Sequence, residues 1–232
     1  MSSATPLRVA LLGATGAVGR NVLAEALRSP AFASVTTLGR RPAFVAAGEA
    51  PAGKLAQHVV DLEDPASYRA HVAGHTAAIC TLGIGEPSKA TREQMWKVEV
   101  DYVMGFAGAC KEEGVQHFSL MTSVGTDTRS RVEYLRLKGT LEERVQALGF
   151  TRTSLFRPSM LLTEKNRYGA SQAMILAVWP KIDWMLAGPL HRYRGIRVED
   201  LGKAMAMNAA RPGAPGVEVL EWDGFQRILR EA

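Results

Sequence analysis

Three side chains near the middle of the chain have the types and spacing of a proton-transfer site. Tyr134 and Lys138 are four residues apart, so on a helix they lie on one face, one turn apart. An ammonium near a phenol favours the phenolate and lowers the pKa of the tyrosine. Such a phenol can exchange a proton with a carbonyl or alcohol oxygen near neutral pH. Ser123 follows an apolar run, where its hydroxyl could hydrogen-bond the same oxygen.

A glycine-rich turn near the N-terminus adds weight to this interpretation, since an isolated Tyr-x-x-x-Lys is also ordinary helix surface. The apolar run Leu7–Leu12 ends in Gly13-x-x-Gly16-x-x-Gly19, and an amphipathic segment follows. Gly13 permits a tight turn, Gly16 lets the backbone approach a phosphate, and Gly19 lets the helix pack on the strand. The N–H groups at the helix start then bind the anion. Strand, turn and helix together predict a site for a dinucleotide pyrophosphate.

The end of the second predicted strand bears on the choice of cofactor. Proteins that bind NAD carry an Asp or Glu about 20 residues past the glycine turn, for the ribose 2′-hydroxyl. This chain has Gly39-Arg40-Arg41 there and no carboxylate. A guanidinium pair suits a 2′-phosphate by charge and by bidentate geometry. We therefore expect NADP(H), the alternative being that one arginine is merely at the surface.

Strand-like and helix-like segments alternate, which predicts an α/β fold with a doubly wound, mostly parallel sheet. Strands are expected at 7–12, 35–38, 57–60, 77–82, 117–121 and 153–156, and helices at 18–28, 65–72, 89–113 and 132–148. Residues 157–197 show little periodicity. After them we expect a helix at 199–210, a strand at 217–220 and a final short helix. We expect one domain, 1–232, with a dinucleotide-binding core at 7–157 and a substrate-side cover and C-terminal elements at 158–232. In the cover, Met174, Trp179, Trp184 and Met185 could line an apolar pocket or simply pack in the core.

Composition excludes several other classes of protein. Hydrophobic residues make up 47% of the 232 positions and charged residues 22%, as in a soluble globular protein. The net charge of +5 is dispersed, so we expect no nucleic-acid partner. No apolar run is long enough for a membrane span, and without a signal peptide a cytoplasmic location is the expectation. Cys80 and Cys110 are expected to be inert core thiols, and no metal site is expected.

Several stretches make the chain resemble a known family, the atypical short-chain dehydrogenase/reductases, and within it the Tat-interacting-protein-like oxidoreductase branch. The resemblance runs from residue 7 to about 162. The stretches that carry it include GATGAVGRNVL (13–23), VVDLED (59–64), CTLG (80–83), HFSLMTSVG (117–125), YLRLKGTLEERV (134–145) and FRPSMLL (156–162). Two features depart from the family pattern. Thr122-Ser123 stands where relatives often have two serines, and the asparagine that many extended members carry near 99–101 is absent.

The resemblance implies a Rossmann fold that binds NADP(H), with Ser123, Tyr134 and Lys138 as the catalytic set. It also implies that the loop after Asp61 borders the adenine, although Asp61 could equally cap the helix near Pro65. The residues expected to contact the cofactor are Gly13, Thr15, Gly16, Ala17, Val18, Gly19, Arg40, Arg41, Asp61, Leu62, Leu82, Gly83, Thr122, Tyr134, Lys138 and, near the nicotinamide, Pro158.

The function expected from these residues is hydride transfer between NADP(H) and a small-molecule carbonyl or alcohol. A regulator that senses NADP(H) without turnover is the main alternative, although regulator-like relatives often lack the tyrosine. A sugar-nucleotide epimerase or dehydratase is a weaker one, because the C-terminal part is short. The two long helix patterns could pair across a homodimer, so a monomer and a dimer both stay open.

Overall fold

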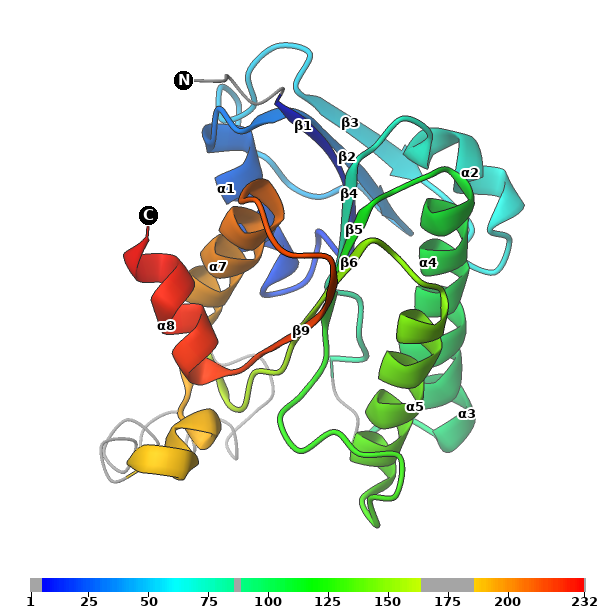
Figure 1. Cartoon of the computed structure of the whole chain (residues 1–232). Coiled ribbons are helices and arrows are strands. Elements are labelled where there is room, and N and C mark those ends of the chain that lie inside the picture. The colour runs from blue at the N-terminus through cyan, green and yellow to red at the C-terminus, as the bar shows by residue number, and fades with distance from the viewer. Residues whose placement is uncertain (1–5, 86–88, 164–185, 232) are drawn as a thin grey trace.

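A seven-stranded sheet forms the centre of the molecule, and every neighbouring pair of its strands is parallel (Figure 1). The computed structural model describes residues 6–85, 89–163 and 186–231. The strand order is β3-β2-β1-β4-β5-β6-β9. The strands are β1 Leu7–Leu12, β2 Phe32–Gly39, β3 Leu55–Val59, β4 Ala77–Cys80, β5 His117–Met121, β6 Arg152–Phe156 and β9 Gly216–Leu220. The order changes direction between β1 and β4, which opens the ligand crevice of such sheets at their carboxyl ends.

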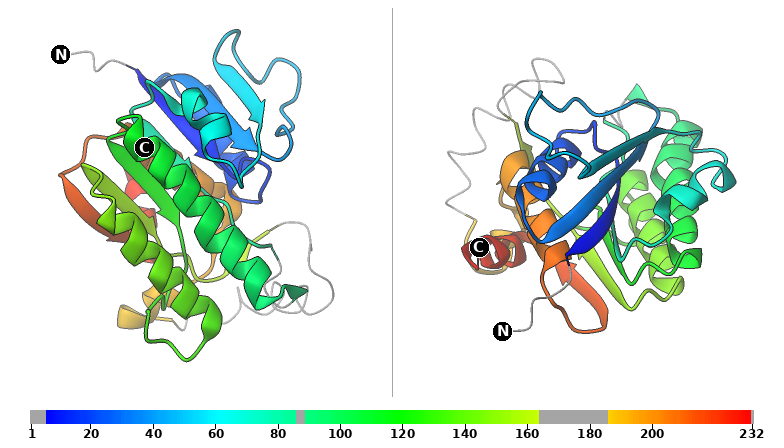
Figure 2. Two further views of the ribbon diagram at one scale, coloured as in Figure 1. Left: turned by 90° about the vertical axis from the view of Figure 1, so that its right-hand side faces the viewer. Right: turned by 90° about the horizontal axis from the view of Figure 1, so that it is seen from above.

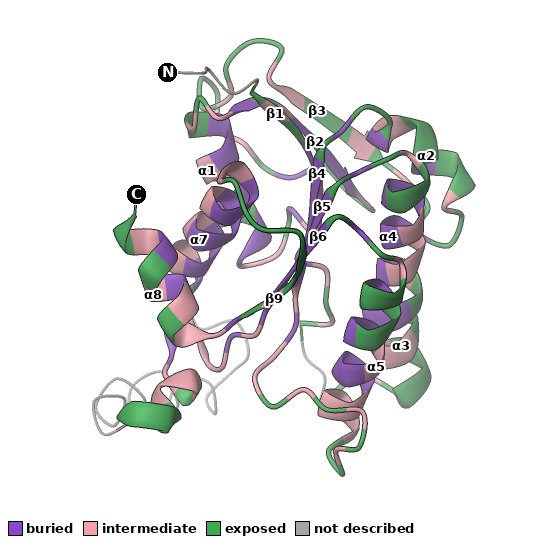
Figure 3. Cartoon of the chain, viewed as in Figure 1, coloured by how far each residue is buried: buried purple, intermediate pink, exposed green. Residues whose placement is uncertain are grey.

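Helices cover both faces of this sheet (Figures 1 and 2). One face carries α1 (Gly19–Arg28), α7 (Val198–Ala210) and α8 (Trp222–Arg230), and the other carries α2 (Ala66–Val72), α4 (Tyr102–Glu112) and α5 (Glu133–Ala147). Each layer has its own apolar core. The central strands are therefore buried on both sides, as Figure 3 shows, and this explains why they appear in the sequence as unbroken apolar runs.

The predicted doubly wound parallel fold is confirmed, and two predicted strands, 7–12 and 117–121, have the observed bounds. The helix predicted over 89–113 is present as a continuous helical run from Arg92 to Glu112, but a π-helical turn inside it was not predicted. A capping box of Thr91 and Gln94 starts the short helix α3, Arg92–Trp96. A π-helical turn, η2 (Lys97–Asp101), then separates α3 from α4. Such turns shift the register of the side chains that follow and are frequent at functional sites.

The C-terminal part contains elements that the sequence pattern did not predict. Strands β7 (Leu161–Leu162) and β8 (Ile196–Arg197) pair in parallel as a second, two-stranded sheet, and a 3-10 turn, η4, covers Gly188–Tyr193. The four residues suggested as a pocket lining, Met174, Trp179, Trp184 and Met185, lie outside the described residues.

Candidate functional site

The glycine turn between β1 and α1 is closely packed against the end of β4. Gly13 has a φ of +93°, which side-chain-bearing residues rarely adopt, and a Cβ there would come within 2.6 Å of the backbone nitrogen of Leu82. A Cβ on Gly19 would overlap the carbonyl oxygen of Gly13. Ala17 and Val18 lead into α1, whose first turn contains no acidic residue. A tight turn and a helix start without negative charge fit the pyrophosphate of a dinucleotide.

A cavity of about 380 Å³ lies beside this turn. It is lined by Leu12, Gly13, Ala14, Thr15, Thr37, Leu38, Gly39, Arg40, Arg41, Ala43, Leu62 and Leu82. The structure thus brings together the turn, the arginine pair at the end of β2, and the two leucines expected near the cofactor. Both arginine side chains are exposed.

Asp61 does not line this cavity, and it does not cap α2. Its Oδ1 accepts a hydrogen bond from the N–H of Glu63 at 2.9 Å. The carboxylate at the start of α2 is that of Asp64, which accepts from the N–H of Ala66 at 3.1 Å. The alternative of a helix-capping Asp61 is therefore wrong, and its contact with the adenine stays a prediction.

Tyr134 and Lys138 lie on the first turns of α5, the helix that follows the carboxyl end of β5. The Nζ of Lys138 is 5.8 Å from the centroid of the Tyr134 ring. Lys138 is only 2% exposed, whereas Tyr134 is partly exposed. Burial raises the pKa of Tyr134, Lys138 lowers it, Glu99 raises it, and the net direction is above the ordinary value. The sequence-based expectation of a lowered pKa is therefore wrong in this structure, because it considered the lysine alone.

Glu99 is a member of this site that the sequence analysis did not identify. It comes from the π-helical turn η2 and is 1% exposed. Its Oε2 lies 2.5 Å from the Nζ of Lys138, and its Oε1 accepts from the N–H of Ile84 at 2.7 Å. Burial disfavours the ammonium, but the carboxylate outweighs this and holds the pKa of Lys138 above its ordinary value. Gly83, expected beside the cofactor, packs against this carboxylate.

A second buried carboxylate, Glu142, lies one turn further along the same face of α5. Its Oε1 accepts from the Oγ1 of Thr122 at 2.5 Å and from the Nε of Arg157 at 3.0 Å. The hydroxyl of Thr122, which the sequence places near the cofactor, is thus bonded to Glu142. The network ties α5 to the ends of β5 and β6. Its sequence signal is the i, i+4, i+8 spacing of Tyr134, Lys138 and Glu142.

Ser123 is partly exposed just beyond the end of β5. Its hydroxyl is 3.4 Å from the carbonyl oxygen of Val124, a weak local contact that leaves it available for a ligand. The N–H of Val124 donates to the carbonyl of Pro158 at 2.9 Å. The segments that carry Ser123 and Pro158 are therefore joined at the carboxyl edge of the sheet.

The chain matches known proteins over most of its length. Residues 13–173 match the model of a family described as NAD(P)H-binding. The chain is 32% identical over 213 residues to Protein HTATIP2 of Rattus norvegicus, which covers 92% of this chain and 85% of that protein. It is 34% identical over 171 residues to the mitochondrial protein fmp52 of Aspergillus fumigatus, which covers 72% of each chain.

Solved structures share the fold at low sequence identity. One is MoeE5 in complex with UDP-glucuronic acid and NAD, with a TM-score of 0.70 and 16% identity over 93% of this chain and 76% of that chain. Another is a short-chain dehydrogenase/reductase superfamily protein from Agrobacterium tumefaciens with bound NAD, with a TM-score of 0.67 and 17% identity over 97% of this chain and 81% of that chain.

The expected cytoplasmic location is contradicted by the relatives. The fmp52 proteins of Aspergillus fumigatus, Neurospora crassa and Candida albicans are all named mitochondrial. Among the described residues, no helix combines the length and the apolar character needed to cross a membrane. The resemblance seen in the sequence is confirmed by the family match, the relatives and the fold together. The chain belongs to the NAD(P)H-binding family, with HTATIP2 and Fmp52 proteins as relatives and the Rossmann-type fold of the short-chain dehydrogenase/reductases.

Proposed function

We propose that this protein is an NADP(H)-dependent oxidoreductase that transfers hydride between the nicotinamide and a small carbonyl or alcohol substrate. The observation that carries the proposal is the buried ammonium of Lys138 over the ring of Tyr134, with Nζ 5.8 Å from the ring centroid. A phenol next to a fixed cation can lose its proton to a reacting oxygen at moderate cost, because the cation stabilises the phenolate. In a chain of the NAD(P)H-binding family, this pair supports proton transfer coupled to hydride transfer.

The preference for NADP(H) rests on the cavity beside the glycine turn. Arg40 and Arg41 line it together with Gly13, and both guanidinium groups are exposed. Two guanidinium groups complement the two negative charges of a 2′-phosphate, and no Asp or Glu among the lining residues is present to accept from a ribose 2′-hydroxyl. Gly13 and Gly19 allow the tight turn that leads into α1, because a Cβ on either would collide with backbone atoms of Leu82 or Gly13.

The protein's own groups manage the proton, whereas a bound nicotinamide dinucleotide supplies the site that gives or takes the hydride. Because the pKa of Tyr134 lies above its ordinary value, the phenol is protonated at neutral pH. It can then donate its O–H proton to a carbonyl oxygen while the carbonyl carbon is reduced, and Lys138 stabilises the phenolate that remains. The hydroxyl of Ser123 can donate a hydrogen bond to the same oxygen.

The test is NADPH oxidation across a panel of aldehydes and ketones, for wild type and Tyr134→Phe. General acid catalysis of this kind contributes about 10²–10⁴-fold in rate, so we expect a loss of that order in kcat for the variant. Cofactor affinity, measured by fluorescence titration, serves as the control for intact folding and should change little. Tight cofactor binding without turnover of any panel member would reject the enzyme and favour a sensor of NADP(H).

A further inference from the structure

The carboxylate of Glu99 joins two parts of the proposed site that are far apart in the sequence. Its Oε2 faces the ammonium of Lys138 on α5, and its Oε1 accepts from the N–H of Ile84 in the loop after β4. That loop also contains Leu82, which lines the cavity beside the glycine turn. The Glu99 side chain therefore contacts both Lys138, the lysine beside Tyr134, and the loop that borders the cofactor cavity.

Stability alone does not explain this arrangement. The side chains of Lys138 and Glu99 are 3% and 1% exposed, so both charges have lost their water. Burying two charges costs several kcal/mol for each ion, and well-packed apolar residues in place of such a pair are often no less stable. The π-helical turn that carries Glu99 adds a departure from regular helix geometry. A costly pair whose ammonium lies 5.8 Å from the ring centroid of the proposed proton donor points to a role in the reaction.

We propose that Glu99 is a positioning residue of the reaction proposed above: it fixes the ammonium of Lys138 beneath Tyr134, anchors the loop at Ile84, and sets the pH range in which Tyr134 gives up its proton. The inference rests on the proposed function, but its central measurement needs no turnover.

The charges around the phenol define the expected effect. Tyr134 is influenced by Lys138 from its own helix and by Glu99 from η2. Cys80, on β4, is the further group that acts on Lys138, and burial raises the pKa of its thiol to about 12, so it stays neutral. Burial raises the pKa of Tyr134, Lys138 lowers it and Glu99 raises it, so the net direction is upward and the phenol remains protonated. Without the carboxylate, the ammonium has only the phenolate as a counter-ion, and the pair gives up a proton at lower pH.

Glu99→Gln isolates the charge, because a glutamine amide oxygen can still accept from the N–H of Ile84. The phenolate absorbance of the cofactor-free protein is followed as the pH rises, and Tyr134→Phe identifies the signal of this residue. We expect the transition of Tyr134 to move down by about 1–3 pH units in Glu99→Gln, the usual effect of an uncompensated cation at this range. Glu142→Gln is the matched control. It removes an equally buried carboxylate from the same helix neighbourhood, but Glu142 is not among the groups that act on Tyr134, so the transition should stay in place.

Two further variants keep the test decisive. Glu99→Asp retains the charge but is one methylene shorter, so the titration should stay near that of wild type while kcat falls. If Glu99→Gln does not fold, the same change is tested in a Lys138→Met background, where loss of the carboxylate should still move the transition of Tyr134 to lower pH. An unchanged titration in the folded charge variant overturns the proposal for Glu99.

Kinetics separate this inference from the proposed function. If carbonyl reduction occurs, the pH limb of kcat should shift down in Glu99→Gln along with the phenol titration. A shifted titration in a protein that reduces no carbonyl supports the role of Glu99 in tuning the phenol and rejects the enzyme. The opposite outcome is turnover that depends on Tyr134, while Glu99→Gln changes neither the pH limb of kcat nor the phenol titration. That outcome supports the enzyme and rejects the role of Glu99.

Discussion

His117 at the start of β5 makes the stability of the fold depend on pH. The side chain is 8% exposed, and its Nε2 lies 2.7 Å from the Oγ of Ser154. Burial lowers the pKa of this imidazole, the nearby guanidinium of Arg152 lowers it further, and Glu218 opposes them, giving a value of about 4. Protonation would place a second cation beside Arg152 in a buried site, so the native state resists it.

The size and sign of the effect follow from the two states. In the unfolded chain His117 takes up its proton near pH 6.5, whereas in the folded protein it does so near pH 4. Because the folded-state pKa is depressed, the stabilisation is fully present above pH 6.5 and is lost as the pH falls through about 4. A difference of about 2.5 pKa units corresponds to about 3 kcal/mol of unfolding free energy.

The assay is urea unfolding of wild type and His117→Gln at several pH values between about 7 and 4. The glutamine is neutral throughout and can still hydrogen-bond Ser154. Wild type should lose about 3 kcal/mol more than the variant over this range, whatever their difference at neutral pH. His75, another buried histidine with a pKa lowered mainly by burial, is present in both proteins, so its contribution cancels. Parallel curves for the two proteins would refute the reasoning.

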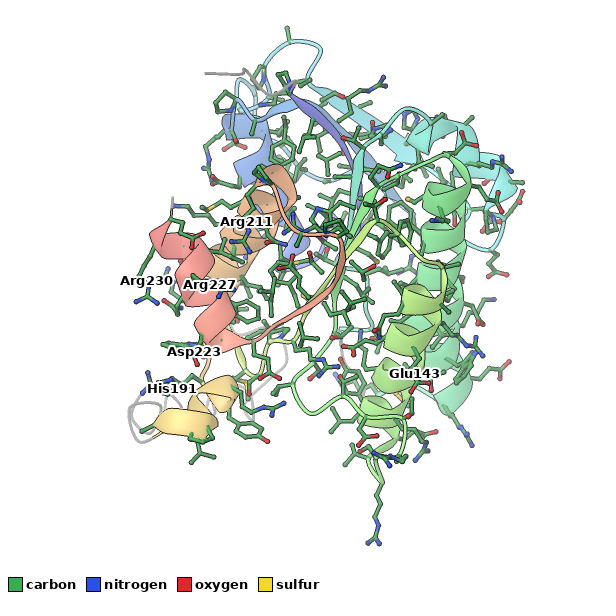
Figure 4. All side chains as sticks on the ribbon, in the orientation of Figure 1. Glu143, His191, Arg211, Asp223, Arg227 and Arg230 are labelled. Atoms are coloured by element: carbon green, nitrogen blue, oxygen red, sulfur yellow. The ribbon has the colours of Figure 1, made fainter. Side chains whose placement is uncertain are left out.

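Three other substitutions test the site itself. Replacing both Arg40 and Arg41 by serine should raise the Kd for NADPH at least about 10-fold more than the Kd for NADH. The reason is that hydrogen bonds to charged groups contribute about 1.5–3 kcal/mol each. Equal losses of affinity for the two cofactors in a fluorescence titration would reject the assignment of the 2′-phosphate. Glu142→Gln should cost about 1.5–3 kcal/mol in chemical denaturation, since it removes the negative charge and replaces one of the two oxygens that accept from the guanidinium of Arg157. The control is Glu143→Gln on the exposed side of α5 (Figure 4), which should change stability by less than about 0.5 kcal/mol, and similar costs for both would contradict the network. Gly13→Ala should weaken NADPH and NADH alike, because its φ and the 2.6 Å approach to a backbone atom both oppose a side chain; unchanged affinity would show that the turn does not border the cofactor.

The sequence predicts the sheet well because its information is local. A buried parallel strand needs only a short apolar run between polar ends, and Leu7–Leu12 and His117–Met121 satisfy that condition on their own. The helix pattern over 89–113 predicts the helical run but misses one feature inside it. Its periodicity does not register the π-helical turn at Lys97–Asp101, and the buried side chain of that turn, Glu99, pairs with Lys138, which lies 39 positions further along the chain. A contact of that range leaves no trace in the spacing of apolar residues.

The candidate site follows the same division. The tyrosine–lysine spacing is local, and the structure brings the two groups together on one helix face. The direction of the shift in the Tyr134 pKa was predicted wrongly, because it depends on burial and on the carboxylate of Glu99 as well as on the lysine. An ammonium lowers the pKa of a neighbouring phenol less when a carboxylate is paired with that ammonium. The helix spacing therefore predicts the tyrosine–lysine pair, whereas the charge around that pair also depends on Glu99, which the π-helical turn contributes from a distant part of the sequence.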